Sequence, residues 1–403
     1  MIDFVMMNLE FFIFVLLLSI FLIIKRKNLE VQGFIPIFYF MLYKTKWGIN
    51  LMDKWAREYP RLFKGLARYS YFVGVWGLII GILILVWSLY IVIDNEHIST
   101  GGGLVLPIET EGDPMEAAVP VFYVPFWYWI AAIFILVVVH EFAHGVIARR
   151  FKVPIKSSGF AFLGILLPII PAAFVEPDEK KMSSKSCYEQ ISILGAGSAS
   201  NFLFGGLFLL FFLTVTFPFF QNTMEVDDLY FSSVDNRSSL YDEGIESGRI
   251  ISFEGEESSE KFVHKTSNLE VNKTYNLGVV DQDGEERNIN ITTLAHNMDS
   301  QRGAIGIGGI EYKNVPKEGY EWLGSFPEYL NMFFLYLWLL NIGIGLMNLL
   351  PLWITDGGRI LYILLNRWMS EDNAAMYTTL ISFATLLLVI VVIWPDLIYP
   401  LIP

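Results

Sequence analysis

The sequence predicts a polytopic α-helical membrane protein with about six spans and one soluble domain inserted between the fourth and fifth spans. Three observations predict this class. The 403 residues are 54% hydrophobic and only 17% charged, whereas average proteins contain about 25% charged residues. Apolar stretches of roughly 20 residues, the length that crosses a bilayer as a helix, recur along the chain. Residues 221–327 are instead richer in charged and small residues.

The expected spans cover approximately residues 9–24, 71–93, 126–148, 191–217, 329–350 and 377–393. They divide the chain into an N-terminal span with a basic segment (1–69), two parts of a membrane domain (70–220 and 328–403) and the soluble domain (221–327). The first span is expected to be an uncleaved anchor. Asp3, and no basic residue, precedes it, and no small-residue cleavage site follows it.

Basic residues in the short loops predict the orientation of the spans. Residues 25–68 contain ten Lys or Arg and three acids, whereas residues 94–125 contain no Lys or Arg and six acids. The positive-inside rule therefore places residues 25–68 in the cytoplasm. Both termini and the soluble domain are then expected outside the cytoplasm. The protein is predicted to be integral to the cell membrane, with the lipid bilayer as its first partner.

Charge and cysteine content exclude two further classes. The net charge of −13 argues against nucleic acid as a partner. The single cysteine, Cys187, cannot form an intrachain disulfide framework.

The third span contains the sequence HEFAH at residues 140–144. Side chains four residues apart share one face of a helix, so His140 and His144 can bind one metal ion together. Glu141 lies about 100° away around the helix, where a general base for a metal-activated water belongs. Ionisable groups inside a membrane are costly and usually functional. The cluster is therefore expected to bind metal, at the cytoplasmic end of this span.

The sequence MNLLPLWITDGGR at residues 347–359 offers a further ligand. Pro351 ends the fifth span after Asn348, and Asp356 follows in an apolar setting on the side of the membrane where the histidines are expected. On these residues alone, two roles are equally open to Asp356. It is either the third metal ligand or the N-cap of a helix that begins near Gly357.

The two motifs together resemble those of site-2 proteases, intramembrane zinc metalloproteases that pair H-E-x-x-H on one span with N-x-x-P and D-G on a later one. HEFAH and NLLPLWITDG match both motifs. The resemblance implies that His140, His144 and Asp356 ligate one zinc ion per chain. It also implies that Glu141 is the catalytic base.

A third motif, GAGSASNFLFGG at residues 195–206, resembles the G-P-x-x-N element of the same family. Gly197 and Asn201 match this element, whereas Ser198 stands where proline is usual. The resemblance implies that Asn201 and Asn348 position the substrate. The same small residues also suit close packing between membrane helices, and both interpretations are kept.

Residues 155–179 are apolar but interrupted by two glycines and two central prolines. A lipid-facing helix tolerates such interruptions poorly, so the segment is expected to be re-entrant or interfacial. Site-2 proteases have a re-entrant β-hairpin here, which implies a hairpin over residues 160–175 whose edge could pair with substrate. A buried apolar loop is the alternative.

Residues 238–257 of the soluble domain resemble the beginning of a PDZ domain, as found in many members of this family. The stretch contains a small helix-forming segment, a strand with Ile250 and Ile251, and glycines at 244, 248 and 255. The fold class is therefore completed as a polytopic helical protein with a re-entrant hairpin and an inserted extracytoplasmic α/β PDZ-like domain. This domain is expected to bind a peptide C-terminus or to cap the site.

The predicted function is hydrolysis of a peptide bond within or next to a transmembrane segment of a membrane-protein substrate, as in regulated intramembrane proteolysis. One alternative is a membrane-anchored PDZ-type binding or chaperone protein with a structural or inactive zinc site. The presence of Glu141 argues against it, because a structural site needs no base. A metal transporter is disfavoured because the spans lack further acids and an internal repeat.

Overall fold

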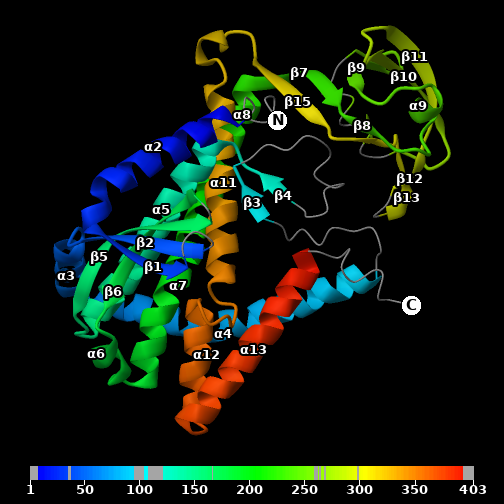
Figure 1. Ribbon diagram of the computed structural model, residues 1–403. Coiled ribbons are helices and arrows are strands. Elements are labelled where there is room, and N and C mark those ends of the chain that lie inside the picture. Colours follow the sequence, from blue (N-terminus) through cyan, green and yellow to red (C-terminus); the bar gives the residue numbers. More distant parts are fainter. Residues whose placement is uncertain are drawn as a thin grey trace. The chain divides into compact units, whose positions relative to one another are not determined.

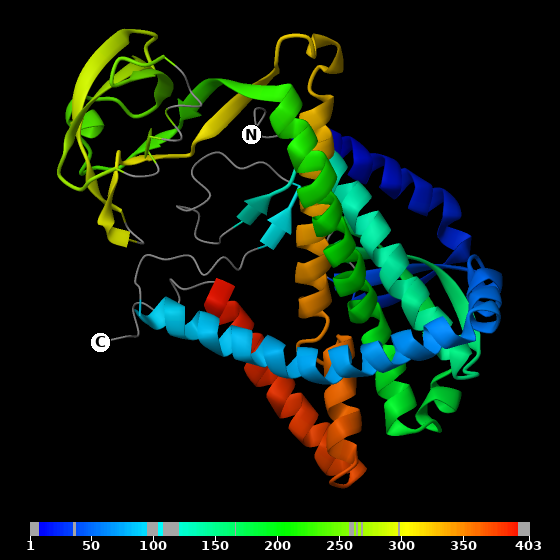
Figure 2. The same ribbon diagram turned by 180° about the vertical axis from the view of Figure 1, so that it is seen from behind.

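The computed structural model describes residues 8–34, 38–94, 104–107, 121–165, 167–257, 262, 265–266, 269–296 and 299–393. The chain divides into two compact units. Unit 1 consists of Met1–Leu210 and Phe333–Pro403, and unit 2 of Phe211–Met332. Figures 1 and 2 show that most helices belong to unit 1 and most strands to unit 2.

Among the described residues, five helices are long and apolar enough to cross a membrane. They are α4 (Pro60–Asp94), α5 (Phe126–Arg150), α7 (Cys187–Phe211) with its continuation to Thr223, α11 (Phe326–Met347) and α13 (Glu371–Ile393). The continuation of α7 consists of the π-helical segment η2 (Phe212–Thr216) and α8 (Phe217–Thr223).

These five helices correspond to the second to sixth predicted spans. The first predicted span is helix α2 (Leu9–Lys25), which has 17 residues. It is followed by the 3-10 turn η1 (Arg26–Asn28). A polytopic helical membrane protein is therefore supported, and the count of six spans stays a prediction.

Helix α5 begins directly after Pro125 and runs through an apolar sequence without internal proline. It ends at two basic residues, and Lys152 beyond them adopts a left-handed conformation (φ 60°). A short helix, α3 (Ile49–Glu58), packs along the last turns of α5. A Cβ at Gly145 of α5 would overlap the side chain of Met52 on α3, and Arg149 forms an ion pair with Asp53. The basic N-terminal segment thus supports the helix that holds the HEFAH motif.

Helices α4 and α7 approach each other closely through glycine. A Cβ on Gly195 would lie only 3.2 Å from the Cα atom of Gly74, and it would overlap the carbonyl oxygen of Ser70. The small residues of α7 therefore do allow close helix packing, as one of the two interpretations of this motif expected. They lie in an apolar core that also includes Ile191, Ile193 and Leu194.

A four-stranded antiparallel sheet lies beside α5 in unit 1, with strand order β1-β2-β5-β6 (Figure 1). Strands β5 (Ile155–Ile165) and β6 (Leu167–Pro177) form the hairpin expected over residues 160–175, so the buried-loop alternative was wrong. Strands β1 (Leu29–Phe34) and β2 (Phe38–Thr45) were not predicted. Among the described residues β6 pairs with β5 alone, so it is an edge of this sheet.

The remaining elements of unit 1 are short. Strand β3 (Leu104–Leu106) pairs in parallel with β4 (Val121–Tyr123). Helix α6 (Glu179–Ser183) follows the hairpin, and helix α12 (Asp356–Asn366) lies between α11 and α13 in the sequence.

Unit 2 contains a five-stranded antiparallel sheet with strand order β11-β10-β9-β7-β15. These strands are β7 (Met224–Phe231), β9 (Gly248–Phe253), β10 (Thr274–Asp281), β11 (Glu286–Thr292) and β15 (Glu311–Pro316). Smaller elements are β8 (Ser233–Val234), α9 (Ser239–Asp242), β12 (Leu294–His296), β13 (Asp299–Ala304), β14 (Ile307–Gly308) and η3 (Glu321–Leu323).

The beginning of unit 2 has the local outline expected from residues 238–257. Helix α9 is followed by Gly244 with φ 74°, then by β9, and then by Gly255 with φ 76°. This order of elements fits a PDZ domain. It covers only the beginning of unit 2, and the assignment stays a proposal.

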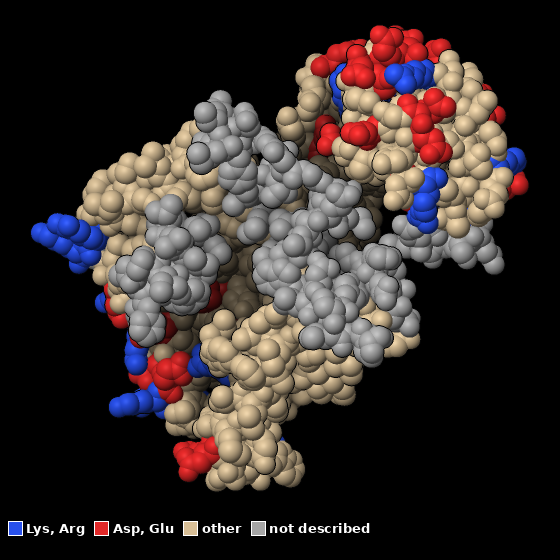
Figure 3. All heavy atoms as spheres, turned by 45° about the vertical axis from the view of Figure 1, so that its right-hand side comes forward, with Lys and Arg blue, Asp and Glu red and all other residues tan. Residues whose placement is uncertain are grey.

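The two units differ in surface chemistry. Figure 3 shows Asp and Glu side chains gathered on unit 2, whereas the visible helices of unit 1 carry broad uncharged surfaces. On α4, Trp76, Leu83 and Trp87 are each more than half exposed. Such contiguous exposed apolar surface suits contact with lipid.

Candidate metal and catalytic site

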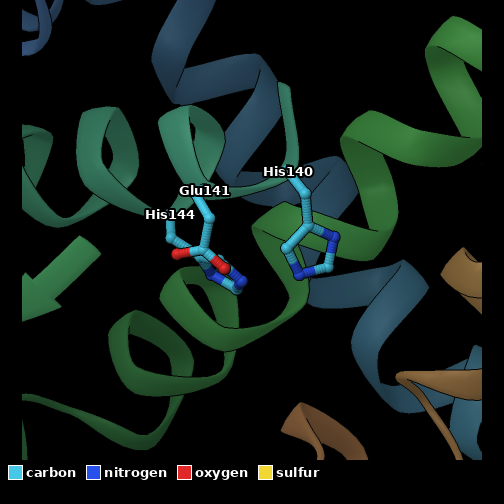
Figure 4. A group of neighbouring side chains, drawn as sticks. All are labelled: His140, Glu141 and His144. Atoms are coloured by element: carbon cyan, nitrogen blue, oxygen red, sulfur yellow. The ribbon is translucent and has the colours of Figure 1, made fainter. Parts of the chain in front are cut away.

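Helix α5 presents His140, Glu141 and His144 as one cluster. Each residue contributes a potential ligand atom, and these atoms all lie within 4.8 Å of one another. Both imidazoles are buried, and Figure 4 shows the two rings directed toward helix α7. The four-residue spacing produces this geometry, because it returns the second histidine to the same face of the helix. The polar cluster is thus placed inside the unit and away from its lipid-compatible surface.

Asp356 lies opposite these two rings. Its Oδ2 atom is 3.5 Å from Nε2 of His140 and 3.2 Å from Nε2 of His144. The capping role is taken by its neighbour, since Thr355 is the N-cap of α12 and its hydroxyl accepts from the Gly358 amide. The carboxylate of Asp356 is therefore left to face the histidines.

The glycines after Asp356 allow α12 to begin at this place. A Cβ on Gly357 would overlap the Leu349 carbonyl, and a Cβ on Gly358 would overlap the Leu352 carbonyl. The Gly357 amide donates to the carbonyl of Asn348 at 2.8 Å, which closes the loop between α11 and α12. The D-G-G sequence is thus a packing requirement that fixes the position of Asp356.

The second nitrogen of each imidazole is also held. Nδ1 of His144 lies 2.7 Å from the carbonyl oxygen of Ile193, and Nδ1 of His140 lies 3.1 Å from the side-chain amide of Asn201. A carbonyl oxygen accepts from a protonated Nδ1, which leaves Nε2 as the unprotonated, metal-binding nitrogen. The Asn201 atom that faces Nδ1 of His140 is the amide nitrogen, and the buried amide oxygen has no partner among the described residues. Exchange of the two ends of this amide would turn the oxygen toward the ring and give His140 the same tautomer.

These residues fit a zinc ion. Two imidazole Nε2 atoms and one carboxylate oxygen converge on one place, and each imidazole is oriented from behind by a hydrogen-bond partner. Three protein ligands of the nitrogen and carboxylate type, with one open position, are typical of catalytic zinc. A structural zinc site normally closes all four positions with protein ligands. The donor set therefore favours a catalytic site.

Glu141 connects the cluster to the β-hairpin. Its Oε2 atom accepts a hydrogen bond of 2.8 Å from the backbone amide of Val175 on β6. Val175 is in register with Ser158 of the neighbouring strand β5, and its amide is directed at Glu141. The candidate base thus contacts the strand that lies at the end of this sheet among the described residues.

Gly197 is the closest approach of α7 to the cluster. A Cβ at this position would overlap the Nε2 atoms of both His140 and His144. Only glycine leaves both Nε2 atoms free, so this position matters for the histidine pair in addition to helix packing. The sequence motif included Gly197 but did not reveal this contact.

The two predicted substrate-positioning asparagines lie in different settings. Asn201 is fully buried and touches His140, so its geometry favours orientation of that ring. Asn348 is half-buried at the end of α11, and its predicted contact with substrate stays a prediction. Val175 and Asp53 were not singled out by the sequence, because their contacts with α5 join segments far apart in the chain.

Comparison with known proteins agrees with this geometry. A model described as "Peptidase family M50" matches residues 128–391, which is more than half of the chain and includes every residue of the cluster. The chain is also 26% identical over 341 residues to an uncharacterized protein of Methanocaldococcus jannaschii. That alignment covers 82% of this chain and 78% of the relative. The likeness extends beyond the matched region but adds nothing on activity.

Proposed function

The chain belongs to peptidase family M50, a family of zinc metalloproteases, and from this premise we propose that it is a site-2-type intramembrane protease. It hydrolyses a peptide bond within or next to a transmembrane segment of a membrane-protein substrate. The single observation that carries this proposal is the convergence of two imidazole Nε2 atoms and the Asp356 carboxylate beside Glu141. The apolar helices support an integral membrane location.

We assign the ligand role for one zinc ion to His140, His144 and Asp356. A zinc ion held there supplies Lewis-acid chemistry, because it lowers the pKa of water and polarises a carbonyl group. Glu141 takes the proton from the attacking water and passes it to the leaving amine, and its contact with the Val175 amide holds the carboxylate in position. The Ile193 carbonyl keeps His144 in the tautomer that presents Nε2, and the Asn201 side-chain amide holds the ring of His140 in place.

The edge of β6 is proposed to bind the substrate in extended form. A helical peptide bond is shielded by its own hydrogen bond, so the substrate must partly unwind before attack. Backbone groups of an unwound segment can then pair with the edge strand, as in other cases of strand addition. Asn348 directly follows α11, and we retain it as a substrate-positioning residue.

The orientation and the soluble unit complete the proposal. On the basis of the loop charges, we place the zinc site near the cytoplasmic side of the membrane. Both termini and unit 2 are then outside the cytoplasm. Unit 2 is proposed to be a PDZ-like domain that binds a peptide C-terminus, for which α9, β9 and the two positive-φ glycines give support. We propose that a protease site in the membrane together with an external peptide-binding domain serves regulated intramembrane proteolysis.

The test uses the purified full-length protein in liposomes with a panel of single-span substrates, and the products are identified by mass spectrometry. We expect wild-type protein to cut within or next to the span. Glu141→Gln is expected to reduce the rate by about 10²–10⁴-fold, the usual contribution of a general base. A zinc chelator should also stop cleavage, and added zinc should restore it.

Two outcomes would contradict the proposal. Cleavage that survives Glu141→Gln would remove Glu141 from the mechanism. Protein that holds about one zinc per chain but cuts no member of a varied panel would favour the membrane-anchored binding protein.

A further inference from the structure

An apolar cavity of about 400 Å³ lies in unit 1 between α2, α5 and the hairpin β5–β6. Its lining is contributed by Phe14 and Leu18 of α2, by one side of α5, and by both strands of the hairpin. Binding sites for small ligands have volumes in the same range, about 300–1,000 Å³. The cavity therefore has room for several large side chains.

The α5 wall of this cavity leads directly to the candidate base. Ile130, Phe134, Val137 and Val138 line the cavity. Relative to Ile130 they lie at i+4, i+7 and i+8, which is the spacing of one helix face. Glu141 lies at i+11, three residues after Val138 and four after Val137, so it continues the same face.

The hairpin wall leads to the same carboxylate. Ala173 of β6 lines the cavity and is paired with Phe160 of β5, which lines it as well. Two residues beyond Ala173, the backbone amide of Val175 donates to Glu141. The cavity is thus bounded on two sides by elements that meet at Glu141.

We propose that this cavity is a specificity subsite that receives apolar side chains of the substrate's transmembrane segment next to the bond that is cut. The inference rests on the proposed function and adds to it the class of side chain that the enzyme selects. An extended substrate on the edge of β6 would direct alternate side chains to one face. Ala173 leaves the space that a large apolar side chain fills, and Phe14 and Leu18 of α2 complete the lining.

The first test measures occupancy without turnover. Photo-reactive benzoylphenylalanine replaces Phe134 in Glu141→Gln protein, which is incubated in liposomes with a single-span reporter whose span is rich in leucine. The matched control carries the same probe at Phe383 on α13, since Phe134 is 54% and Phe383 is 55% exposed. We expect the reporter to cross-link at position 134 and not at position 383.

Equal yields at the two positions, or lipid adducts alone at position 134, would overturn the subsite. The failure of the proposed function is a separate result, because it appears as the absence of reporter cleavage by wild-type protein.

The second test changes the size of the subsite. Ala173→Phe fills it, and the exposed Ala375→Phe on α13 serves as the control. The measured quantity is the ratio of kcat/KM for reporters with leucine or alanine at the position that faces the cavity. Rejection of one large side chain lowers this ratio by roughly 10–100-fold.

Phe134→Ala enlarges the same space and is expected to raise the ratio, so the two variants act in opposite directions. An unchanged ratio in both variants, with cleavage retained, would remove the subsite from specificity.

Discussion

The α5–α7 contact of unit 1 and the β-sheet core of unit 2 are buried to a similar extent but with opposite chemistry. Between α5 and α7, the buried side chains include His140, His144, Ser198 and Asn201. The core of unit 2 consists of apolar side chains such as Leu277 and Ile291. The ion pair of Arg249 with Asp228 lies on more exposed side chains.

The buried polar side chains of unit 1 serve function, whereas the apolar core of unit 2 serves folding. Burial of polar groups costs free energy unless each finds a partner, so a cluster of them is maintained for its chemistry. Unit 2 instead follows the rule of an ordinary sheet, in which β11 alternates exposed and buried positions. Substitutions in the first region should therefore change metal binding at the proposed zinc site, whereas substitutions in the apolar core of the second should change stability and leave metal binding intact.

The largest effect is expected from Gly197→Ala in unit 1. The added methyl group overlaps both Nε2 atoms and displaces the ligands themselves. Because the loss of a residue that only orients a ligand costs about 10–100-fold in metal affinity, this variant should lose at least ~100-fold. Metal content of the purified protein, measured by mass spectrometry, gives the result.

Gly206→Ala is the matched control on the same helix, because a Cβ there meets nothing within 4 Å. If both alanine variants keep full zinc, Gly197 does not border the metal position.

The next effect belongs to unit 2. Leu277 is fully buried on β10, so Leu277→Ala should destabilise this unit by about 2–5 kcal/mol. Hydrogen exchange of the full-length protein, followed for peptides from the five-stranded sheet, measures the change. Zinc content should stay at the wild-type level. The exposed Tyr241→Ala is the control, and loss of zinc in Leu277→Ala would break the separation between the two regions.

The sequence predicted the parts of this molecule that are local. The long apolar runs located the helices, and the i, i+4 spacing of the histidines located one half of the cluster. Asp356 lies more than 200 residues away from them, so residue chemistry alone left capping and ligation equally open. The structure gives the cap to Thr355 and places Asp356 beside the two imidazoles, and ligation by Asp356 stays a proposal.

Other features depended on contacts that no local pattern reports. Strand β2 pairs with β5 across more than 100 residues, for example Thr45 with Ser158. Neither strand alone indicates the other as its partner. The contact between Glu141 and Val175 is likewise set by the packing of the hairpin against α5. The unpredicted β1–β2 pair thus belongs to the sheet that supports the site.

A smaller effect on the proposed zinc site is expected from Asn201→Leu. The variant removes the hydrogen bond to His140 Nδ1 while keeping a buried side chain of similar size. We expect zinc affinity to fall about 10–100-fold, as for other residues that orient a ligand. Competition with a fluorescent zinc chelator measures the affinity.

The control is Asn341→Leu, which replaces another fully buried asparagine whose amide donates to the carbonyl of Leu337 within α11. Unchanged zinc affinity in Asn201→Leu, together with a raised KM, would return Asn201 to the substrate-positioning role that the sequence motif implied.

The smallest effect is expected at Asp228, on the surface of the unit 2 sheet. Its carboxylate accepts from Arg249 at 2.7 Å and from Lys313 at 3.2 Å, so it joins β7 to both neighbouring strands. The hydrogen bond from Arg249, followed by that from Lys313, lowers the pKa of Asp228 below its ordinary value. Exposed ion pairs are weak, so Asp228→Asn should change the opening equilibrium of these strands by less than about fivefold at pH 7.

The pH dependence of this difference has a defined sign. A carboxyl group with a lowered pKa in the folded state stabilises that state fully above its unfolded pKa of about 3.9. This stabilisation is lost as the pH falls through the lower folded pKa. Wild-type and Asp228→Asn proteins should therefore differ in hydrogen exchange at pH 7 and converge below about pH 4. Zinc content at pH 7 should be identical in the two proteins. A change in zinc content would show that the surface of unit 2 influences the buried polar cluster of unit 1.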